Sequence, residues 1–314
     1  MKISKLSELG GVAVEGVDLS ALGSAEQDRA LKRLYDQQGL VVFRGQRLTK
    51  QQLVNAGAPF GGTMLDKVGI VPDAEVKGIT VISTRGPTGE VIPQDPTKLI
   101  GDLEWHSDQG YLTVPNRGKI LYAVQVAEEG GKTGFIDGQL TYNALANAMK
   151  KRIANLHVIQ SWKRAESYIA RNRDYRIKGH EELRMDRFPD VAYPIVYEHP
   201  ITGQKVLNVP PLYAAGIVEM PGSEGNALIE ELVGHIKQPK FHYWHSYQVG
   251  DAVLWDNWRF LHAASGTPGR YVRTLWSITL LGGPELGRVI AKTAAAHLRT
   301  AHAEISRCQS TTIL

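Results

Sequence analysis

Hydrophobic spacing predicts two short amphipathic helices in the first part of the chain. Ser24 is followed three positions later by Gln27, and apolar residues then recur at helical spacing until Gly39. Thr49 and Gln52 repeat this pattern ahead of a second glycine-terminated run. A serine or threonine with glutamine three residues later, then a periodic apolar face and a glycine, is typical of a capped helix. The apolar run "LVVFRG" between the two helices predicts a buried strand.

The pattern changes after residue 116 to short β-rich runs that glycine, proline and asparagine separate. The runs are "KILYAVQV", "GFID", "AYPIVYEH", "KVLNV", "DAVLWD" and "VRTLWSITLL". Many short strands with this punctuation favour a sandwich or barrel over a doubly wound sheet. Several runs are apolar at both alternating sets of positions, so we expect one face to line a barrel and helices to cover the other. Helical spacing returns in "QLTYNALANAMKKRIANL" and "GSEGNALIEELVGHIKQ", which gives a fold class of mainly β with flanking helices.

Two further segments depart from this pattern. Residues 163–190 are dense in charge and poor in periodic apolar positions, which predicts a lid or insert, although a solvated helical face would have the same composition. Residues 284–314 include the alanine-rich "GRVIAKTAAAHLRTAHAEI", which predicts a C-terminal helical extension and one candidate contact for a homo-oligomer. Because the sequence contains no repeat, low-complexity tract or linker, we expect a single domain over residues 1–314.

The composition limits the binding partners and the cellular compartment that we expect for this protein. The chain has 36 basic and 32 acidic residues, a formal net charge of +4, and the tail after Glu285 carries four basic residues against one acidic residue. The main body is therefore close to neutral, and we expect no nucleic-acid partner. Cys308 is the single cysteine, so neither an intrachain disulfide nor a thiolate metal cluster can form. No apolar run reaches the roughly 18 residues of a membrane span, and we expect a cytoplasmic protein without a membrane partner.

The stretch "GDLEWHSDQGYL" at residues 101–112 contains the first candidate chemistry. His106 and Asp108 lie two apart on what reads as an extended segment, where residues i and i+2 project to the same face. An imidazole and a carboxylate on one face can bind a metal if a third ligand comes from elsewhere, although a His-x-Asp pair is also common on surfaces and in hydrogen-bonded cores. The segment "LWDNWRFLHAASG" offers His262 as the third ligand. Two histidines and one carboxylate form a facial triad, which favours iron(II) over zinc.

Two other histidines compete for the third ligand position. His242 and His245 lie three apart in "FHYWHS", which on a strand places them on opposite faces, so we expect both to be packing or surface residues. Eleven residues after His262, Arg273 stands within the strand pattern "GRYVRTLWSI".

Several segments occur in the order found in one enzyme family. They are "GVAVEGVDLS", "GLVVFRGQRLT", "WHSDQGYL", "EEGGKTGFID", "YQVGDAVLWDNWRFLHAA" and the late arginine. On these segments, over residues 10–283, the chain resembles the taurine dioxygenase and 2,4-dichlorophenoxyacetate dioxygenase (TauD/TfdA) family of Fe(II)/2-oxoglutarate-dependent dioxygenases. The resemblance implies a double-stranded β-helix, a cupin-like jelly roll of two sheets with helices packed outside.

The resemblance also implies roles for individual residues. His106, Asp108 and His262 match the family's iron ligands. Thr133 in "GGKTGF" and Arg273 match the hydroxyl and the bidentate guanidinium that hold the carboxylate of 2-oxoglutarate farthest from iron. A buried carboxylate is bound better by a permanently charged planar donor pair than by an ammonium, and the apolar neighbours of Arg273 argue against a surface position.

The family couples oxidative decarboxylation of 2-oxoglutarate by O2, which yields succinate and CO2, to hydroxylation of an unactivated C–H bond. The implied cofactors are therefore Fe(II), 2-oxoglutarate as cosubstrate and O2. Related halogenases have a small residue at the position of Asp108, so the intact carboxylate disfavours halogenation. Desaturation, cyclisation or oxidative cleavage in a secondary-metabolite pathway stay open, because they diverge from hydroxylation late in the reaction. A non-catalytic jelly-roll metal-binding protein is disfavoured, since none of the five matched residues is replaced.

The predicted substrate site departs from the family at three positions. Members that oxidise small sulfonates or aryloxyacetates carry a second arginine four residues after the cosubstrate arginine, where this chain has Ser277 on the same strand face. Asp102 stands where taurine dioxygenase has an amide that contacts the substrate, and Asp66 aligns near its substrate-binding histidine. These carboxylates predict a small-molecule substrate with an amine or another hydrogen-bonding group. Two alternatives stay open: Asp102 on a solvated strand edge, and a cation from residues 163–180 that binds an anionic substrate.

Overall fold

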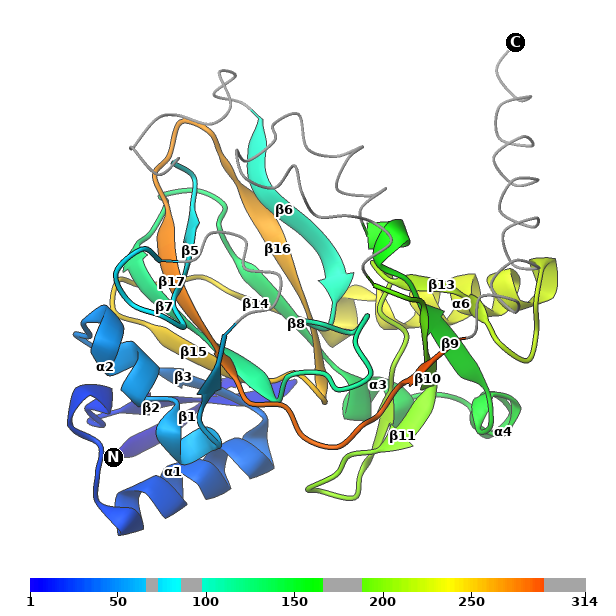
Figure 1. Cartoon of the computed structure of the whole chain (residues 1–314), viewed down its shortest axis with the longest axis horizontal. Coiled ribbons are helices and arrows are strands. Elements are labelled where there is room, and N and C mark those ends of the chain that lie inside the picture. The colour runs from blue at the N-terminus through cyan, green and yellow to red at the C-terminus, as the bar shows by residue number, and fades with distance from the viewer. Residues whose placement is uncertain (66–72, 86–97, 166–187, 291–314) are drawn as a thin grey trace.

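Two sheets face each other at the centre of the fold (Figure 1). The structure, a computed structural model, describes residues 1–65, 73–85, 98–165 and 188–290. The large sheet consists of β1 (Lys2–Ser7), β2 (Gly10–Glu15), β3 (Leu40–Phe43), β4 (Thr63–Met64), β5 (Thr80–Ser83), β7 (Gly118–Gln125), β15 (Ala252–Asp256) and β17 (Thr274–Leu280). Its order is β1-β2-β3-β15-β7-β17-β4, with β5 also paired to β17. The facing sheet, in the order β14-β8-β16-β6, consists of β6 (Leu99–His106), β8 (Thr133–Asp137), β14 (His242–His245) and β16 (Phe260–Pro268).

Two smaller sheets and several helices surround this pair. The smaller sheets contain β9 (His157–Gln160), β10 (Val191–Pro194), β13 (Ala214–Ile217) and β18 (Arg288–Val289), and separately β11 (Val196–Glu198) and β12 (Lys205–Leu207). The helices are α1 (Ala25–Gln38), α2 (Lys50–Asn55), α3 (Gly138–Asn143), α4 (Asn147–Ile153) and α6 (Ser223–Ile236), with short 3-10 turns η1 (Leu19–Ala21), η2 (Ala58–Phe60) and η4 (Pro239–Phe241). Figure 1 shows α1 and α2 beside the large sheet and α6 behind β13. The predicted jelly roll, mainly β with flanking helices, is confirmed.

Both predicted N-terminal helices are present, with different caps. Thr49 and Gln52 form the predicted capping box at α2, in which each side chain accepts a hydrogen bond from the other's backbone N–H. Ser24 occupies the N-cap position of α1 but makes no side-chain cap hydrogen bond, and Gly39 ends that helix at a φ of 68°. A residue with a β-carbon would be strained at this φ, so glycine is the residue that suits the stop.

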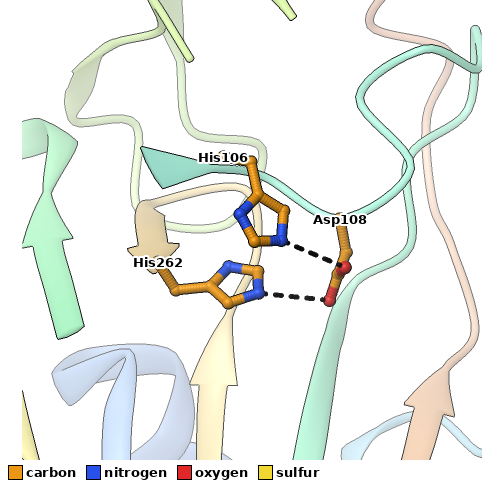
Figure 2. A group of neighbouring side chains, drawn as sticks. All are labelled: His106, Asp108 and His262. Carbon is orange, nitrogen blue, oxygen red and sulfur yellow. Dashed lines mark ion pairs between the residues drawn. The ribbon is translucent and has the colours of Figure 1, made fainter. Parts of the chain in front are cut away.

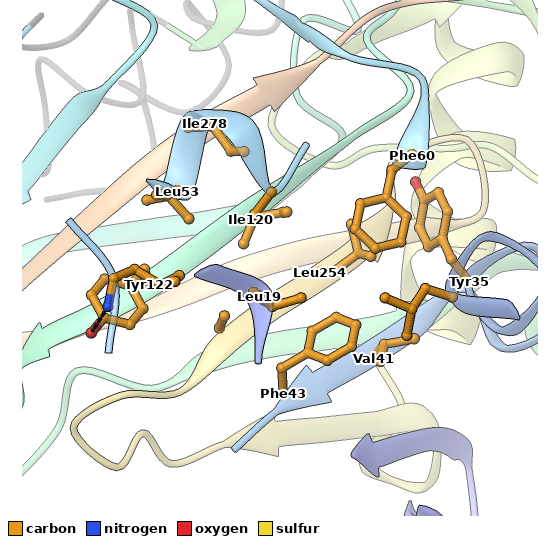
Figure 3. Close-up of a cluster of buried hydrophobic side chains, with 14 of the residues drawn as sticks. Leu19, Tyr35, Val41, Phe43, Leu53, Phe60, Ile120, Tyr122, Leu254 and Ile278 are labelled. Atoms are coloured by element: carbon orange, nitrogen blue, oxygen red, sulfur yellow. Dashed lines mark hydrogen bonds between the residues drawn. The ribbon is translucent and has the colours of Figure 1, made fainter. Parts of the chain in front are cut away.

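The central strands of the large sheet are buried on both faces, as their apolar runs predict. In β3, Val41 and Phe43 face a cluster shared with α1 and α2 (Figure 3), whereas Leu40 and Val42 face a second cluster. That second cluster includes Phe135 of β8 and side chains of β16, so it fills the space between the two facing sheets. Alternate residues of β7, β15 and β17 divide between the same two clusters. We call the side of the large sheet that faces the smaller one its inner face, and the functional side chains below are placed with reference to it.

Two predicted segments lie partly outside the described residues. Residues 166–187 of the expected lid at 163–190 and residues 291–314 of the expected C-terminal extension are not described. Where the extension begins, the chain is not helical: Arg288 and Val289 form β18, which pairs along the edge of β10 that β9 leaves open. The free backbone groups of that edge supply hydrogen-bond partners that local helix propensity cannot anticipate. In the part of the chain that is described, no helix combines the length and hydropathy needed to cross a membrane.

Candidate metal centre

Three predicted ligands meet at one end of the space between the sheets. β6 ends at His106, and Asp108 lies in the turn directly after it rather than on the strand itself. His262, from the adjacent strand β16, is the register partner of His106. One nitrogen from each ring and a carboxylate oxygen all lie within 4.8 Å of one another. Figure 2 shows both imidazoles and the carboxylate pointing toward one another.

The spacing in this cluster suits a shared cation better than direct hydrogen bonds. Nε2 of His106 lies 3.8 Å from Oδ1 of Asp108, and Nε2 of His262 lies 3.6 Å from Oδ2. Both distances exceed the hydrogen-bond range of about 2.7–3.2 Å. The two ring centroids are 4.1 Å apart. Three donors that converge without bonding one another leave space for an ion between them, so the predicted ligand set is brought together.

The electrostatics keep each candidate ligand in its metal-binding form. The Nδ1 atom of His106 lies 2.7 Å from the carbonyl oxygen of Glu104, so Nδ1 donates there and Nε2 keeps its lone pair. Burial lowers the pKa of His106, and burial together with the neighbouring His106 lowers the pKa of His262 well below its usual value. Burial would raise the pKa of Asp108, but Lys119 and the two histidines outweigh burial and hold that pKa below its usual value. Neutral imidazoles and an ionised carboxylate are the protonation states that a metal requires.

Lys119 and Asn257 complete the surroundings of Asp108, and sequence reasoning missed both. The Lys119 ammonium, on β7, lies 3.2 Å from Oδ2 of Asp108, and its side chain is only 12% exposed. Asn257 accepts a hydrogen bond from the Asp108 N–H at 2.7 Å and donates to the Asp108 carbonyl at 2.8 Å, so it holds the peptide groups on both sides of that residue. The lysine at the start of the otherwise apolar run "KILYAVQV" could have indicated a functional role for Lys119. For Asn257 the sequence carried no signal, because its partners are backbone atoms 149 positions away.

The predicted keto-acid residues lie in the same part of the fold. Thr133 begins β8, is 4% exposed, and is on the same strand face as Phe135, the register partner of His262. Arg273 directly precedes β17, where Thr84 fixes its backbone through a hydrogen bond in each direction. Burial lowers the pKa of Arg273. Within the described residues its guanidinium forms no ion pair and no hydrogen bond.

The loop before β8 makes room for this arginine. Gly131 has a φ of +64°, and a β-carbon there would lie 2.7 Å from Cδ and 3.0 Å from Nε of Arg273. Tyr247, a residue that sequence reasoning did not select, supplies the other wall, because its hydroxyl is 2.9 Å from Thr133 Oγ1 and its ring lies under the guanidinium. A half-buried cation without a described counter-ion, beside two hydroxyls, fits an anionic ligand.

The two predicted substrate residues that the structure describes, Ser277 and Asp102, are not brought together. Ser277 lies on the inner face of β17, 1% exposed, and its Oγ has no hydrogen-bond partner among the described residues. Asp102 pairs with Ser265, one position from Leu103, and Leu103 packs against aromatic side chains near His106. Since neighbours on a strand alternate, Asp102 lies on the opposite face of β6 from Leu103. Asp66 lies outside the described residues.

The competing histidines have structural partners elsewhere. His242 packs against Trp105 with tilted rings whose centroids are 4.7 Å apart, and His245 is buried with its Nε2 3.0 Å from Oδ2 of Asp251. Neither belongs to the cluster of candidate ligands. The donor set thus fits one ion at His106, Asp108 and His262, and a carboxylate at Thr133 and Arg273.

Comparison with known proteins finds the same kind of enzyme repeatedly. The family described as taurine catabolism dioxygenase TauD, TfdA matches residues 2–279. The chain is 34% identical over 275 residues to the alpha-ketoglutarate-dependent 2,4-dichlorophenoxyacetate dioxygenase of Cupriavidus pinatubonensis, covering 82% of this chain and 89% of that protein. It is 28% identical over 300 residues to the (S)-phenoxypropionate/alpha-ketoglutarate-dioxygenase of Sphingobium herbicidovorans, covering 94% and 98%. The crystal structure of AAD-2 in complex with Mn(II) and N-oxalylglycine matches with a TM-score of 0.75 at 25% identity, over 91% of this chain and 100% of that one.

Proposed function

Because the chain belongs to the taurine catabolism dioxygenase TauD, TfdA family, we propose that His106, Asp108 and His262 bind its iron and that Thr133 and Arg273 bind its 2-oxoglutarate. The chain is an Fe(II)- and 2-oxoglutarate-dependent dioxygenase that acts on a small organic substrate. One observation carries the residue assignment. Three convergent ligand atoms within 4.8 Å lie in the same inter-sheet space as a half-buried arginine without a described anionic partner.

The residues of this chain orient the reaction. Bound iron(II), 2-oxoglutarate and O2 supply the oxidation of a C–H bond, with release of succinate and CO2. The Glu104 carbonyl fixes the tautomer of His106, and Asn257 fixes the turn that carries Asp108. Arg273 and Thr133 anchor the far carboxylate, which restricts how the keto end can lie. We propose hydroxylation as the outcome, and product analysis distinguishes it from desaturation, cyclisation and oxidative cleavage.

A spectroscopic experiment tests the iron and keto-acid assignment. Anaerobic addition of Fe(II) and then 2-oxoglutarate to the purified chain should produce a visible charge-transfer band, and O2 should then yield succinate. His262→Ala should abolish both, whereas His157→Ala, at a half-exposed histidine paired with Glu219, should leave both unchanged. A full band in His262→Ala, or no band and no succinate in the wild type, would contradict the assignment.

For the primary substrate we propose a small organic acid with an apolar body. Lys119 places a positive charge on the inner face of the large sheet. It is the register partner of Thr279 and lies two positions along β7 from Leu121, the partner of Ser277. Tyr111 and Tyr213 belong to a buried aromatic cluster, and the Tyr213 ring is 6.3 Å from that of His106. Two of the relatives are named for aryloxy acids. The amine-bearing substrate expected from the sequence depended on Asp66 and Asp102, and the latter lies away from this face.

A substrate panel decides between an acid and an amine. Succinate formation and the shift of the charge-transfer band are measured with aryl carboxylates, sulfonates and primary amines. Carboxylates should give coupled turnover, and Lys119→Met should raise their KM. The exposed Lys132 provides the matched control, and Lys132→Met should not change this KM. Selective turnover of amines, or an unchanged KM in Lys119→Met, would contradict the acid proposal.

Two broader expectations also stay proposals. We propose a homo-oligomer, and light scattering on the full chain tests it, with a monomeric mass as the contrary result. A cytoplasmic location is proposed from the single cysteine, Cys308, and localisation of the tagged chain in its native host tests it.

A further inference from the structure

We infer that the Tyr247 hydroxyl is a third hydrogen-bond donor for the distal carboxylate of the keto acid, beside Thr133 and Arg273. The inference rests on the proposed function and adds to it a residue that sets which keto acid is bound. Tyr247 follows β14 by two positions and belongs to the segment "YQVGDAVLWD", which leads into β15.

Three polar groups converge at this point. The Tyr247 hydroxyl is 2.9 Å from Thr133 Oγ1, and the Arg273 guanidinium carbon is 5.5 Å from the centre of the tyrosine ring. The guanidinium therefore lies within cation–π range of the ring. The three groups come from β8, from the segment before β17 and from the segment after β14, so only the tertiary fold assembles them.

The hydroxyl pair can supply donors for a ligand. Two hydroxyls carry two O–H groups, and the single hydrogen bond between Tyr247 and Thr133 uses one of them. The guanidinium of Arg273 beside them has no described anionic partner. Burial raises the pKa of Tyr247 to about 12, so its hydroxyl keeps its proton at neutral pH. When a carboxylate binds and the bond between the hydroxyls is exchanged for bonds to it, two hydroxyl donors and one guanidinium match its capacity to accept several hydrogen bonds.

A second layer of side chains holds the tyrosine in place. The ring of His245 meets that of Tyr247 edge-on at a centroid distance of 4.7 Å. Asp251 accepts from Nε2 of His245 at 3.0 Å and from the Arg44 guanidinium at 2.6 Å. His245 and Asp251 are each about 1% exposed. A donor fixed in this way loses little conformational entropy when the ligand arrives.

The test uses two keto acids of equal length. Binding to the Mn(II)-loaded protein is measured anaerobically by calorimetry with 2-oxoglutarate and with 2-oxopentanoate, which lacks the distal carboxylate. Tyr247→Phe should weaken 2-oxoglutarate about tenfold or more, the size expected for a lost hydrogen bond to a charged group, and should leave 2-oxopentanoate within about twofold. Tyr243→Phe is the matched control, because that hydroxyl contacts His245 Nδ1 at 3.1 Å instead, and it should change neither.

A double variant separates direct contact from an effect through Thr133. If Tyr247 donates to the carboxylate itself, Tyr247→Phe should still weaken 2-oxoglutarate in a Thr133→Val background. No further weakening in that background, or equal weakening of both keto acids by Tyr247→Phe alone, would overturn the inference. If wild-type protein converts 2-oxoglutarate and Tyr247→Phe binds it normally, the inference fails and the proposed function stands. If the wild type neither binds nor converts it, both fail.

Discussion

Replacing Asn257 by alanine should lower the metal affinity of the site without changing any candidate ligand. The side chain accepts from the Asp108 N–H at 2.7 Å and donates to the carbonyls of Asp108 at 2.8 Å and Asn116 at 3.2 Å. A net contribution of about 0.5–1.5 kcal/mol for each hydrogen bond gives a loss of roughly 1.5–4.5 kcal/mol in the free energy of unfolding. The Asp108 turn then loses the side chain that fixes its two peptide groups.

The effect on metal binding can be worked through linkage. Partners that orient a ligand typically change metal affinity about 10–100-fold. A metal ion at 100 times its dissociation constant stabilises the folded protein by about 2.7 kcal/mol. If Asn257→Ala weakens binding about 30-fold, the same concentration should stabilise the variant by only about 0.9 kcal/mol. The variant should therefore show a smaller metal-induced rise in Tm than the wild type.

The assay combines a competitive Co(II) titration against a chelating indicator with denaturant unfolding of the metal-free and metal-loaded forms. Asn143→Ala, at an exposed asparagine at the end of α3, is the control, because it removes an amide that does not contact the Asp108 turn. Asn257→Ser, a milder change, provides a second measurement if the alanine variant unfolds. Reduced stability of the metal-free form combined with wild-type Co(II) affinity would refute the reasoning, because Asn257 would then stabilise the fold without positioning the ligand.

Further predictions concern stability, pH and the arginine site. Burial raises the pKa of Asp251, but hydrogen bonds from its histidine, backbone and arginine partners lower this pKa overall. The contribution of Asp251 to stability is therefore present above about pH 4 and is lost as the pH falls. The Tm of Asp251→Asn should depend less on pH between 7 and 3 than the Tm of the wild type, and an equal dependence would contradict this. Gly131→Ala should displace Arg273 and raise the KM for 2-oxoglutarate, whereas Gly203→Ala, at a similar φ of +68° with nothing within 4 Å, should leave that KM unchanged. Leu254→Ala in the fully buried core should cost about 2–5 kcal/mol by denaturant unfolding, and a loss under 1 kcal/mol would indicate a site that collapses without a cavity.

Sequence patterns predicted correctly those features that depend on residues a few positions apart. The capping box of Thr49 and Gln52 and the two-sided burial of β3 are both read from adjacent residues, because helix capping and strand alternation act over a few positions. The same holds for the candidate ligands, since His106 and Asp108 stand two apart and the motif around His262 is contiguous. The fold brings one ligand atom from each of these residues within 4.8 Å of the others, and their assignment as iron ligands is a proposal.

The pairing register of β16 and β6 determines which other side chains of β6 face the pocket. β16 and β6 pair His262 with His106 but Ala264 with Leu103, so β6 carries an extra residue at a bulge. A shift of one residue turns a strand's side chains to the opposite face, so Leu103 rather than Asp102 lies on the face of His106. Counting from the His-x-Asp motif could not reveal this, because the extra residue is defined only by the neighbouring strand.

The sequence by itself determined the fold class, the enzyme family and the residue types available for an iron and keto-acid site, because periodicity, turn residues and contiguous motifs are encoded over short distances. Only the tertiary structure decided which polar side chains share one space. The proposed roles depend on contacts that Lys119, Tyr247 and Asn257 make with residues more than ten positions away. Strand pairing and loop packing alone bring these partners within 2.7–3.2 Å.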